Sequence, residues 1–221
     1  MMKKYWWKIL AVILLGYTII AGFLGDIPDL DVLHQTIRNL YFHVCMWFVM
    51  IIMLGISVVY SIKYLSGFDS KNDIVAIESA NTGVLFGILG IITGMIWAKF
   101  AWGEWWVNDP KLNGAAIGIM TYLAYIVLRN SIDDKSKKAR ISAAYNIFAF
   151  FIFILFILVL PKLSDGSLHP GDEKKSLMPV FTLDFRLRIV FYPAIIGWTL
   201  LAWWITTLRI RTKKLKINNN I

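Results

Sequence analysis

The chain has 221 residues, of which 58% are hydrophobic and only 17% charged, and its formal net charge is +9 at pH 7. Soluble domains carry charged residues at about a quarter of their positions, so this composition excludes an ordinary soluble enzyme or binding module. The positive charge falls largely in the connections between apolar segments, where it orients a membrane protein, and it is weak evidence for nucleic-acid binding.

Six uninterrupted apolar segments follow one another along the chain. Each has about 17–21 residues, which at about 1.5 Å per residue crosses a hydrocarbon core of about 30 Å. We therefore expect an all-α, polytopic membrane protein in which residues 1–221 form a single six-span domain. The first segment has the length of a span and no clear cleavage site, so we interpret it as a helix and not as a signal peptide. The predicted transmembrane helices are 5–24, 42–62, 80–100, 112–128, 141–160 and 189–208.

Basic residues predict the orientation. If the N-terminus is cytoplasmic, the cytoplasmic side receives 15 of the 23 Lys and Arg residues and the other side receives the remaining 8. The positive-inside rule therefore places both termini in the cytoplasm. The outer side then receives residues 25–41, 101–111 and 161–188.

The connector 101–111 between the third and fourth predicted spans is rich in tryptophan. Trp102, Trp105 and Trp106 have the spacing i, i+3, i+4, so a short surface helix would present all three indoles on one face. Such a face binds either lipid headgroups, as an interfacial aromatic belt, or a flat apolar ligand, and both readings stay open. Asp109-Pro110 is typical of a helix start, so Asp109 is either a helix cap or a ligand contact.

Glycines four residues apart occur in the third span, at Gly83, Gly87, Gly90 and Gly94, and in the fourth. Small residues let two membrane helices approach closely. We therefore expect spans three and four to pack tightly on each other and to hold the Trp-rich connector in place. Scattered glycine, which is common in membrane helices, is the alternative.

Ionisable residues are absent from the centres of the predicted spans. This argues against a proton-coupled pump or an ion-coupled transporter, which needs such groups at mid-membrane. Cys45 is the only cysteine, so it has no partner for an intramolecular disulfide, and we expect it to pack as a small apolar residue.

The three histidines, His34, His43 and His169, all map to the outer side. A lone histidine in a loop is usually solvated. Two imidazoles that share one membrane face with a cluster of tryptophans can instead ligate the iron of a haem from both sides. Three arginines on that side are suited to pair with the propionate carboxylates of a haem: Arg38, Arg186 and Arg188.

The segment Trp102-Gly103-Glu104-Trp105-Trp106-Val107-Asn108-Asp109 resembles the tryptophan-rich WWD segment, WGxWWxWD, of the haem-handling proteins of cytochrome c maturation. It departs from that pattern at Asn108, where the family has a further Trp, and in the Pro110 that follows. The six-span size resembles CcmC, whereas the related CcmF and CcsA proteins are larger. Tyr41-Phe42-His43-Val44 matches the setting of one external axial histidine of the family, and Leu168-His169 fits the place of the other.

The resemblance implies a protein of the bacterial inner membrane that holds haem b (iron protoporphyrin IX) on the periplasmic face. His43 and His169 would ligate the iron. The other residues that it implies at the haem are Trp102, Trp105, Trp106, Asp109, Arg38, Arg186 and Arg188. His34 matches nothing in the pattern, and we assign it to the solvated loop.

The implied role is haem transport in c-type cytochrome biogenesis, with delivery to the haem chaperone CcmE. The implied partners are the ABC-type subunits CcmA and CcmB, the small membrane protein CcmD and membrane lipid. We expect binding and transfer more than enzymatic catalysis. The chain has no Walker motif, so any use of ATP would come from a partner. Two alternatives stay open. One is an ABC-transporter permease, which should show polar residues along its spans. The other is a structural assembly subunit that docks a partner through the Trp segment without haem.

Overall fold

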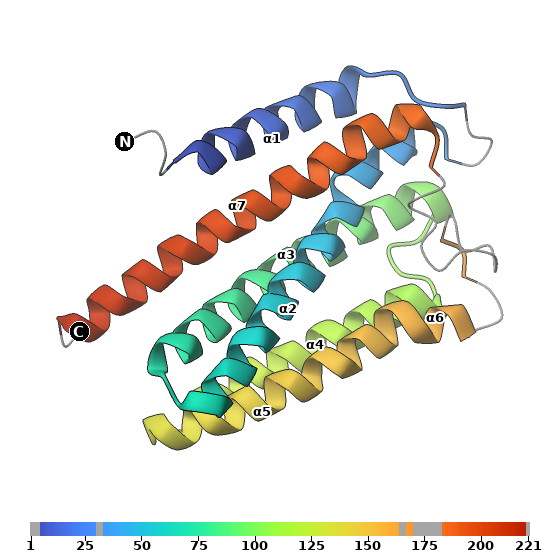
Figure 1. Ribbon diagram of the computed structural model, residues 1–221. Coiled ribbons are helices and arrows are strands. Elements are labelled where there is room, and N and C mark those ends of the chain that lie inside the picture. Colours follow the sequence, from blue (N-terminus) through green and yellow to red (C-terminus); the bar gives the residue numbers. More distant parts are fainter. Residues whose placement is uncertain (1–4, 30–32, 164–166, 170–182, 220–221) are drawn as a thin grey trace.

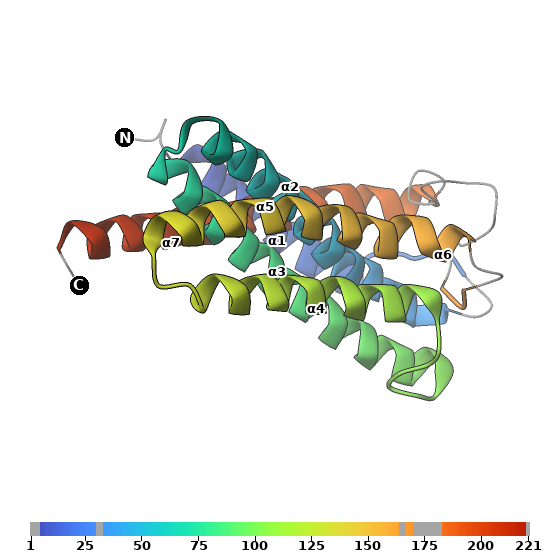
Figure 2. The same cartoon turned by 90° about the horizontal axis from the view of Figure 1, so that it is seen from below.

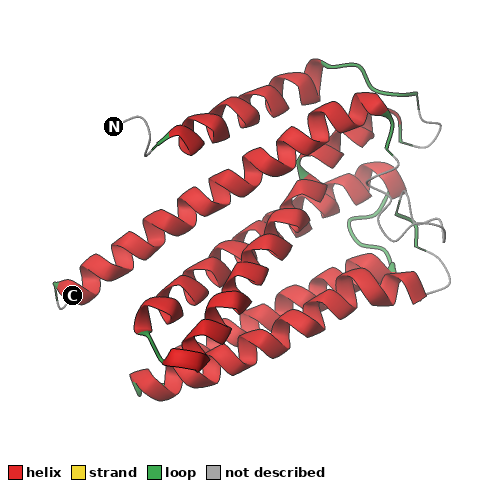
Figure 3. Ribbon diagram, viewed as in Figure 1, coloured by secondary structure: helices red, strands yellow, loops and turns green. Residues whose placement is uncertain are grey.

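The computed structural model describes residues 5–29, 33–163, 167–169 and 183–219. These residues are helical or irregular, and none of them forms a strand (Figure 3). The long helices are α1 (Trp6–Leu24), α2 (His43–Gly67), α3 (Ser70–Trp102), α4 (Pro110–Asn130), α5 (Lys135–Ile154) and α7 (Phe185–Asn218). The short elements are the 3-10 helix η2 (His34–Tyr41), the π-helix η3 (Leu155–Val159) and α6 (Leu160–Leu163).

The prediction of an all-α, multi-pass membrane protein is confirmed. The described residues contain six helical stretches that are long and apolar enough to cross a membrane, and each predicted span lies inside one of them to within a residue at its start. The fifth stretch, Lys135–Leu163, joins α5, η3 and α6. Pro161 has no N–H to donate to the preceding turn, which accounts for the π-helical irregularity before it.

The helices form one bundle whose connections gather at two ends (Figures 1 and 2). Both ends of the chain and the α2–α3 and α4–α5 connections lie at one end, which we call the inner end following the predicted orientation. The opposite, outer end holds η2 and the α3–α4 connection. This arrangement is the one expected for six spans. That the inner end faces the cytoplasm stays a prediction.

A groove of glycines on α3 is filled by side chains of α2. A Cβ atom at Gly94 would lie 2.6 Å from His43, and one at Gly83 would lie 2.8 Å from Leu54. The four contacts follow each other turn by turn, pairing Gly83 with Leu54, Gly87 with Met50, Gly90 with Trp47 and Gly94 with His43. Because the groove brings the two helices close in a fixed register, it sets the position of His43 along the axis of α3.

The expectation that spans three and four pack on each other through their glycines is wrong. The α3 glycines face α2, and Gly114 and Gly118 of α4 face Phe156 and Phe153 of the fifth span. Small residues permit close approach to any neighbouring helix. The spacing therefore predicts a close helix–helix contact but not which helix takes part in it.

The α3–α4 pair is fastened at the inner end by an ion pair. Arg129 of α4 donates from Nη1 and Nη2 to the two carboxylate oxygens of Asp73 on α3, at 2.8 and 2.6 Å. Both side chains are largely buried, and the bidentate geometry is the strongest that a guanidinium and a carboxylate form.

A polar cluster is buried between α2, α3 and α5. Asn146 Nδ2 donates to Ser57 Oγ at 2.7 Å and to Ser61 Oγ at 2.8 Å, and Ser57 Oγ donates to the Ala76 carbonyl at 2.7 Å. The spans are therefore less apolar inside the bundle than their composition suggests. The hydrogen bonds of this cluster connect helices to each other, as is usual for polar residues in membrane bundles.

The short surface helix expected for the Trp-rich connector is not formed. Trp102 is the last residue of α3, and residues 103–109 are not helical. Gly103 has φ +82°, a left-handed conformation that ends α3, and Pro110 occupies the first turn of α4. The stretch between these two signals is too short to sustain a helix of its own.

Candidate functional site

His43 is the first residue of α2 and lies against the backbone of α3. Its Nδ1 is 2.9 Å from the Gly90 carbonyl oxygen and 3.3 Å from Thr93 Oγ1. Because a carbonyl oxygen only accepts hydrogen bonds, Nδ1 carries the proton. The lone pair of the ring is therefore on Nε2, which leaves that nitrogen able to coordinate a metal.

His169 lies in the short described segment 167–169 and contacts the connector. Its Nδ1 is 3.0 Å from Asp109 Oδ1, and its side chain is 17% exposed. A carboxylate also only accepts, so Nδ1 again carries the proton, and in the neutral imidazole the lone pair is on Nε2. Both histidines thus have the tautomer and the supporting hydrogen bond that metal-ligating imidazoles usually show.

Asp109 is the N-cap of α4. Its Oδ1 accepts from the backbone N–H of Lys111 at 2.8 Å and of Leu112 at 3.3 Å, and Pro110 takes the first helical position, where its missing N–H costs nothing. The interpretation of Asp109 as a helix cap is therefore confirmed.

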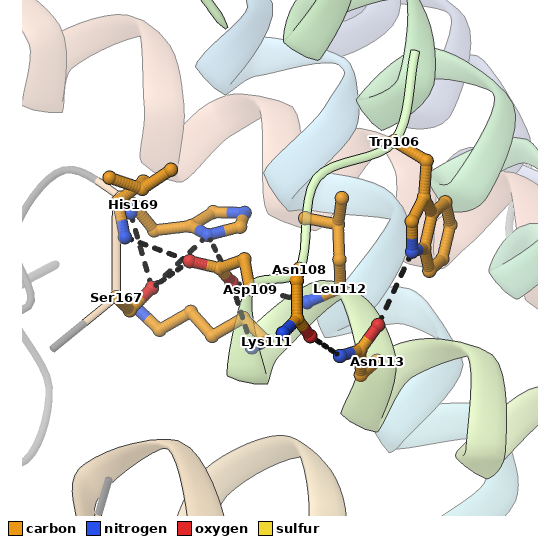
Figure 4. A network of polar contacts seen from close by, with 9 residues as sticks. Trp106, Asn108, Asp109, Lys111, Leu112, Asn113, Ser167 and His169 are labelled. Atoms are coloured by element: carbon orange, nitrogen blue, oxygen red, sulfur yellow. Dashed lines mark hydrogen bonds and ion pairs between the residues drawn. The ribbon is translucent and has the colours of Figure 1, made fainter. Parts of the chain in front are cut away.

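The same carboxylate also holds the segment that carries His169 (Figure 4). Its Oδ2 accepts from Ser167 Oγ and from the backbone N–H of Leu168, each at 2.8 Å. Burial by itself would raise the pKa of the Asp109 carboxyl, but the neighbouring His169 and the Ser167 and Leu168 donors hold it well below its usual range. Asp109 is accordingly ionised at neutral pH and joins two outer segments far apart in the sequence.

The structure brings His43 and His169 together. His43 contacts α3 at Gly90 and Gly94, and the His169 ring packs on Trp97, whose centroid is 6.1 Å away. Gly94 and Trp97 are separated by about 4.5 Å of rise along the same helix. The histidines therefore occupy neighbouring positions on one side of α3.

The tryptophans of the predicted platform are divided between two places. Trp102 packs edge-on against His169, with centroids 5.1 Å apart, and against Trp97 at 4.8 Å. Trp105 and Trp106 lie on the irregular connector and are 52% and 39% exposed. Trp106 donates to Asn113 Oδ1 and lies across the connector from His169 (Figure 4). The three indoles do not form one helical face.

Trp97, which packs on both Trp102 and His169, is a candidate site residue that the sequence analysis did not single out. A usable signal was present, since Trp97 follows Gly90 by seven residues and so continues the glycine face on which His43 lies. Thr93 was not singled out either, and Gly94 was interpreted only as a helix-packing glycine.

The three candidate arginines differ in what they already bind. Arg38 Nη1 donates to two carbonyl oxygens at the end of α1, both at 2.9 Å, and its Nε donates to Gln35. Arg186 pairs with Asp184, the cap of α7. Arg188 has a buried Nε without a hydrogen-bond partner among the described residues. His34 is exposed on the first turn of η2, as expected for a residue outside the site.

Comparison with known proteins gives one consistent result. A family model described as CcmC, heme exporter protein C, matches residues 2–220. The protein named heme exporter protein C of Haemophilus influenzae is 26% identical over 220 residues, covering 94% of this chain and 82% of its own length. Its namesake in Paracoccus denitrificans is 24% identical over 178 residues, covering 80% and 73%. A cytochrome c biogenesis protein CcsA of Prochlorococcus marinus is 36% identical over 83 residues, covering 38% and 27%.

Proposed function

Since the chain belongs to the heme exporter protein C (CcmC) family, we propose that it holds haem b at the outer end of its bundle between His43 and His169. It then hands this haem to a haem chaperone during the maturation of c-type cytochromes. The haem is cargo, and the protein binds and transfers it.

The observation that carries the proposal is that both imidazoles donate a hydrogen bond from Nδ1 to an acceptor inside the protein. Each uses Nδ1–H for a hydrogen bond inside the protein, to the Gly90 carbonyl or to the Asp109 carboxylate, and each keeps the Nε2 lone pair. A bis-imidazole haem takes two such nitrogens, one on each face of the porphyrin. A histidine exposed in a loop would instead form its hydrogen bonds with water.

Aromatic surface beside His169 supports the same proposal. Trp97 and Trp102 form an edge-to-face pair next to the imidazole, and Trp105 remains largely exposed on the connector. Covering apolar porphyrin surface is worth about 25 cal/mol per Å2, so these rings would supply much of the affinity while the histidines set the geometry.

Arg188 is the arginine best suited to receive a propionate. Its Nε is buried and unpaired among the described residues, and a buried guanidinium donor is costly to leave without an acceptor. Arg38 and Arg186 have acceptors inside the protein, so each would have to share its donors or give up a hydrogen bond.

Membership of the family supports a proposal for the partners and the location. The proposed recipient is the chaperone CcmE, and the proposed companions are CcmA, CcmB and CcmD. The proposed location is the bacterial inner membrane, with both termini in the cytoplasm and the haem on the periplasmic face. The excess of basic residues at the inner end supports this orientation.

The test is the visible spectrum of the detergent-purified chain loaded with hemin. We expect the sharp Soret band and split visible bands of a low-spin, bis-imidazole haem. His43→Ala and His169→Ala should each lose that spectrum, and His34→Ala, a matched histidine outside the site, should keep it. A wild-type spectrum in both site variants would reject the ligation scheme. Failure of the wild-type chain to bind hemin would favour the structural-subunit alternative.

A further inference from the structure

We propose that Gly94 is the positioning residue for His43, because its missing side chain lets the imidazole reach the backbone of α3 and bond there through Nδ1. This inference rests on the proposed function, in which His43 supplies Nε2 to the haem iron. It adds a residue that lies outside the Trp segment, the histidines and the arginines.

Contact distances show how little room the imidazole has. A Cβ at Gly94 would lie 2.6 Å from Cε1 of His43, 3.2 Å from Nδ1 and 3.4 Å from Nε2. The imidazole is a rigid plane, so it can escape a methyl group only by moving as a whole. Any such movement breaks the 2.9 Å hydrogen bond from Nδ1 to the Gly90 carbonyl.

Thr93 reinforces the same tautomer. Its hydroxyl donates to the Leu89 carbonyl at 2.7 Å, so toward His43 Nδ1, 3.3 Å away, it can only accept. Two acceptors therefore face Nδ1, and both belong to the α3 turn that Gly94 closes. An imidazole pushed off this turn would be free to rotate and to change tautomer.

The lower part of the glycine groove provides a matched control. Gly87 faces the thioether end of Met50, which is flexible and can turn aside from an added methyl group. The two glycines share a helix, a groove and a neighbouring helix. They differ in whether the side chain opposite is a ligand.

Supporting groups behind a ligating histidine typically change metal affinity by 10- to 100-fold when they are lost. We therefore expect Gly94→Ala to lower hemin affinity by about 10- to 100-fold and to replace the low-spin spectrum by that of a haem with one imidazole. Gly87→Ala should keep the wild-type spectrum. Added free imidazole should restore the low-spin spectrum in Gly94→Ala, because it fills the position that His43 has left.

The experiment compares four full-length chains in detergent, titrated with hemin: wild type, Gly94→Ala, Gly87→Ala and His43→Ala. A wild-type spectrum in Gly94→Ala, together with its loss in His43→Ala, overturns the positioning role and leaves the proposed function intact. A wild-type spectrum in His43→Ala overturns the proposed function itself. Equal spectral loss in both glycine variants also overturns the specific role of Gly94.

A second measurement needs neither hemin nor a glycine variant. Nitrogen NMR of the hemin-free wild-type chain with 15N-labelled histidine reports which ring nitrogen of each histidine carries the proton. The His43 signal, identified by its absence in His43→Ala, should show a protonated Nδ1 and an unprotonated Nε2. The reverse assignment overturns the proposal.

Discussion

Replacing Asp109 by Asn separates its two structural roles. Asn is as good an N-cap as Asp, so its side-chain oxygen can keep the bonds to the first turn of α4. The amide nitrogen then takes the place of Oδ2, which accepts from Ser167 and Leu168. An NH2 group cannot accept from the Leu168 N–H. The change therefore removes the bond from the Leu168 N–H, one of the contacts that hold the segment carrying His169, and spares the helix.

The size of the effect follows from those bonds. A hydrogen bond to a charged group contributes about 1.5–3 kcal/mol. The Ser167 hydroxyl can turn to accept from the new amide, so only the bond from the Leu168 N–H is lost outright. Its loss weakens docking by about 1.5–3 kcal/mol, or about 10- to 100-fold in an equilibrium constant. Because His169 ligates only when its segment is docked, we expect hemin affinity to fall by a similar factor.

The assay is a hemin titration followed at the Soret band. Asp134→Asn is the matched control, because Asp134 caps α5 at the inner end in the same manner, accepting from the Lys137 N–H at 2.6 Å. It should bind hemin like the wild type, and far-ultraviolet circular dichroism should show equal helix content in all three proteins. Equal hemin affinity for Asp109→Asn and the wild type would show that Asp109 does not hold His169 in place.

Two further variants test other parts of the structure. Arg188→Gln should weaken hemin binding by about tenfold or more through the loss of a charged hydrogen bond, without altering the low-spin spectrum, whereas Arg186→Gln should not. Equal affinities in the two variants would remove Arg188 from the site. Gly114→Ala places a methyl group against a backbone carbonyl of the fifth span and should lower stability by about 1–3 kcal/mol. Gly16→Ala meets open space and should be neutral or slightly stabilising. Thermal unfolding compares this pair, and a Gly114→Ala midpoint as high as that of Gly16→Ala would contradict the packing described.

The sequence predicted the helical architecture well, because the length and apolar character of a span are local properties. The predicted segments and the observed helices agree closely. The glycine spacings of α3 and α4 predicted close helix contacts. They did not predict which helices make them, namely α2 and the fifth span. Helix neighbours depend on the whole bundle, and a spacing within one helix carries no such information.

The role of the histidines as haem ligands stays a prediction, while the expected aromatic surface differs from the one observed. The structure places His43 and His169 near the same face of α3, and the aromatic partner of His169 on that helix is Trp97, which the sequence analysis did not single out. The prediction that Trp102, Trp105 and Trp106 share one face required a continuous helix, and α3 ends at Gly103. Single-residue breaks of this kind change the direction of every side chain that follows them.

The two imidazoles differ in how firmly the rest of the structure holds them in place. His43 is built into the bundle, wedged between two long helices, and moves only if they part. His169 is tied through the Asp109 carboxylate in the part of its loop that the structure describes. Under the proposed function, release of the haem would therefore need only the loss of the contacts between Asp109 and residues 167–169, with no movement of the long helices.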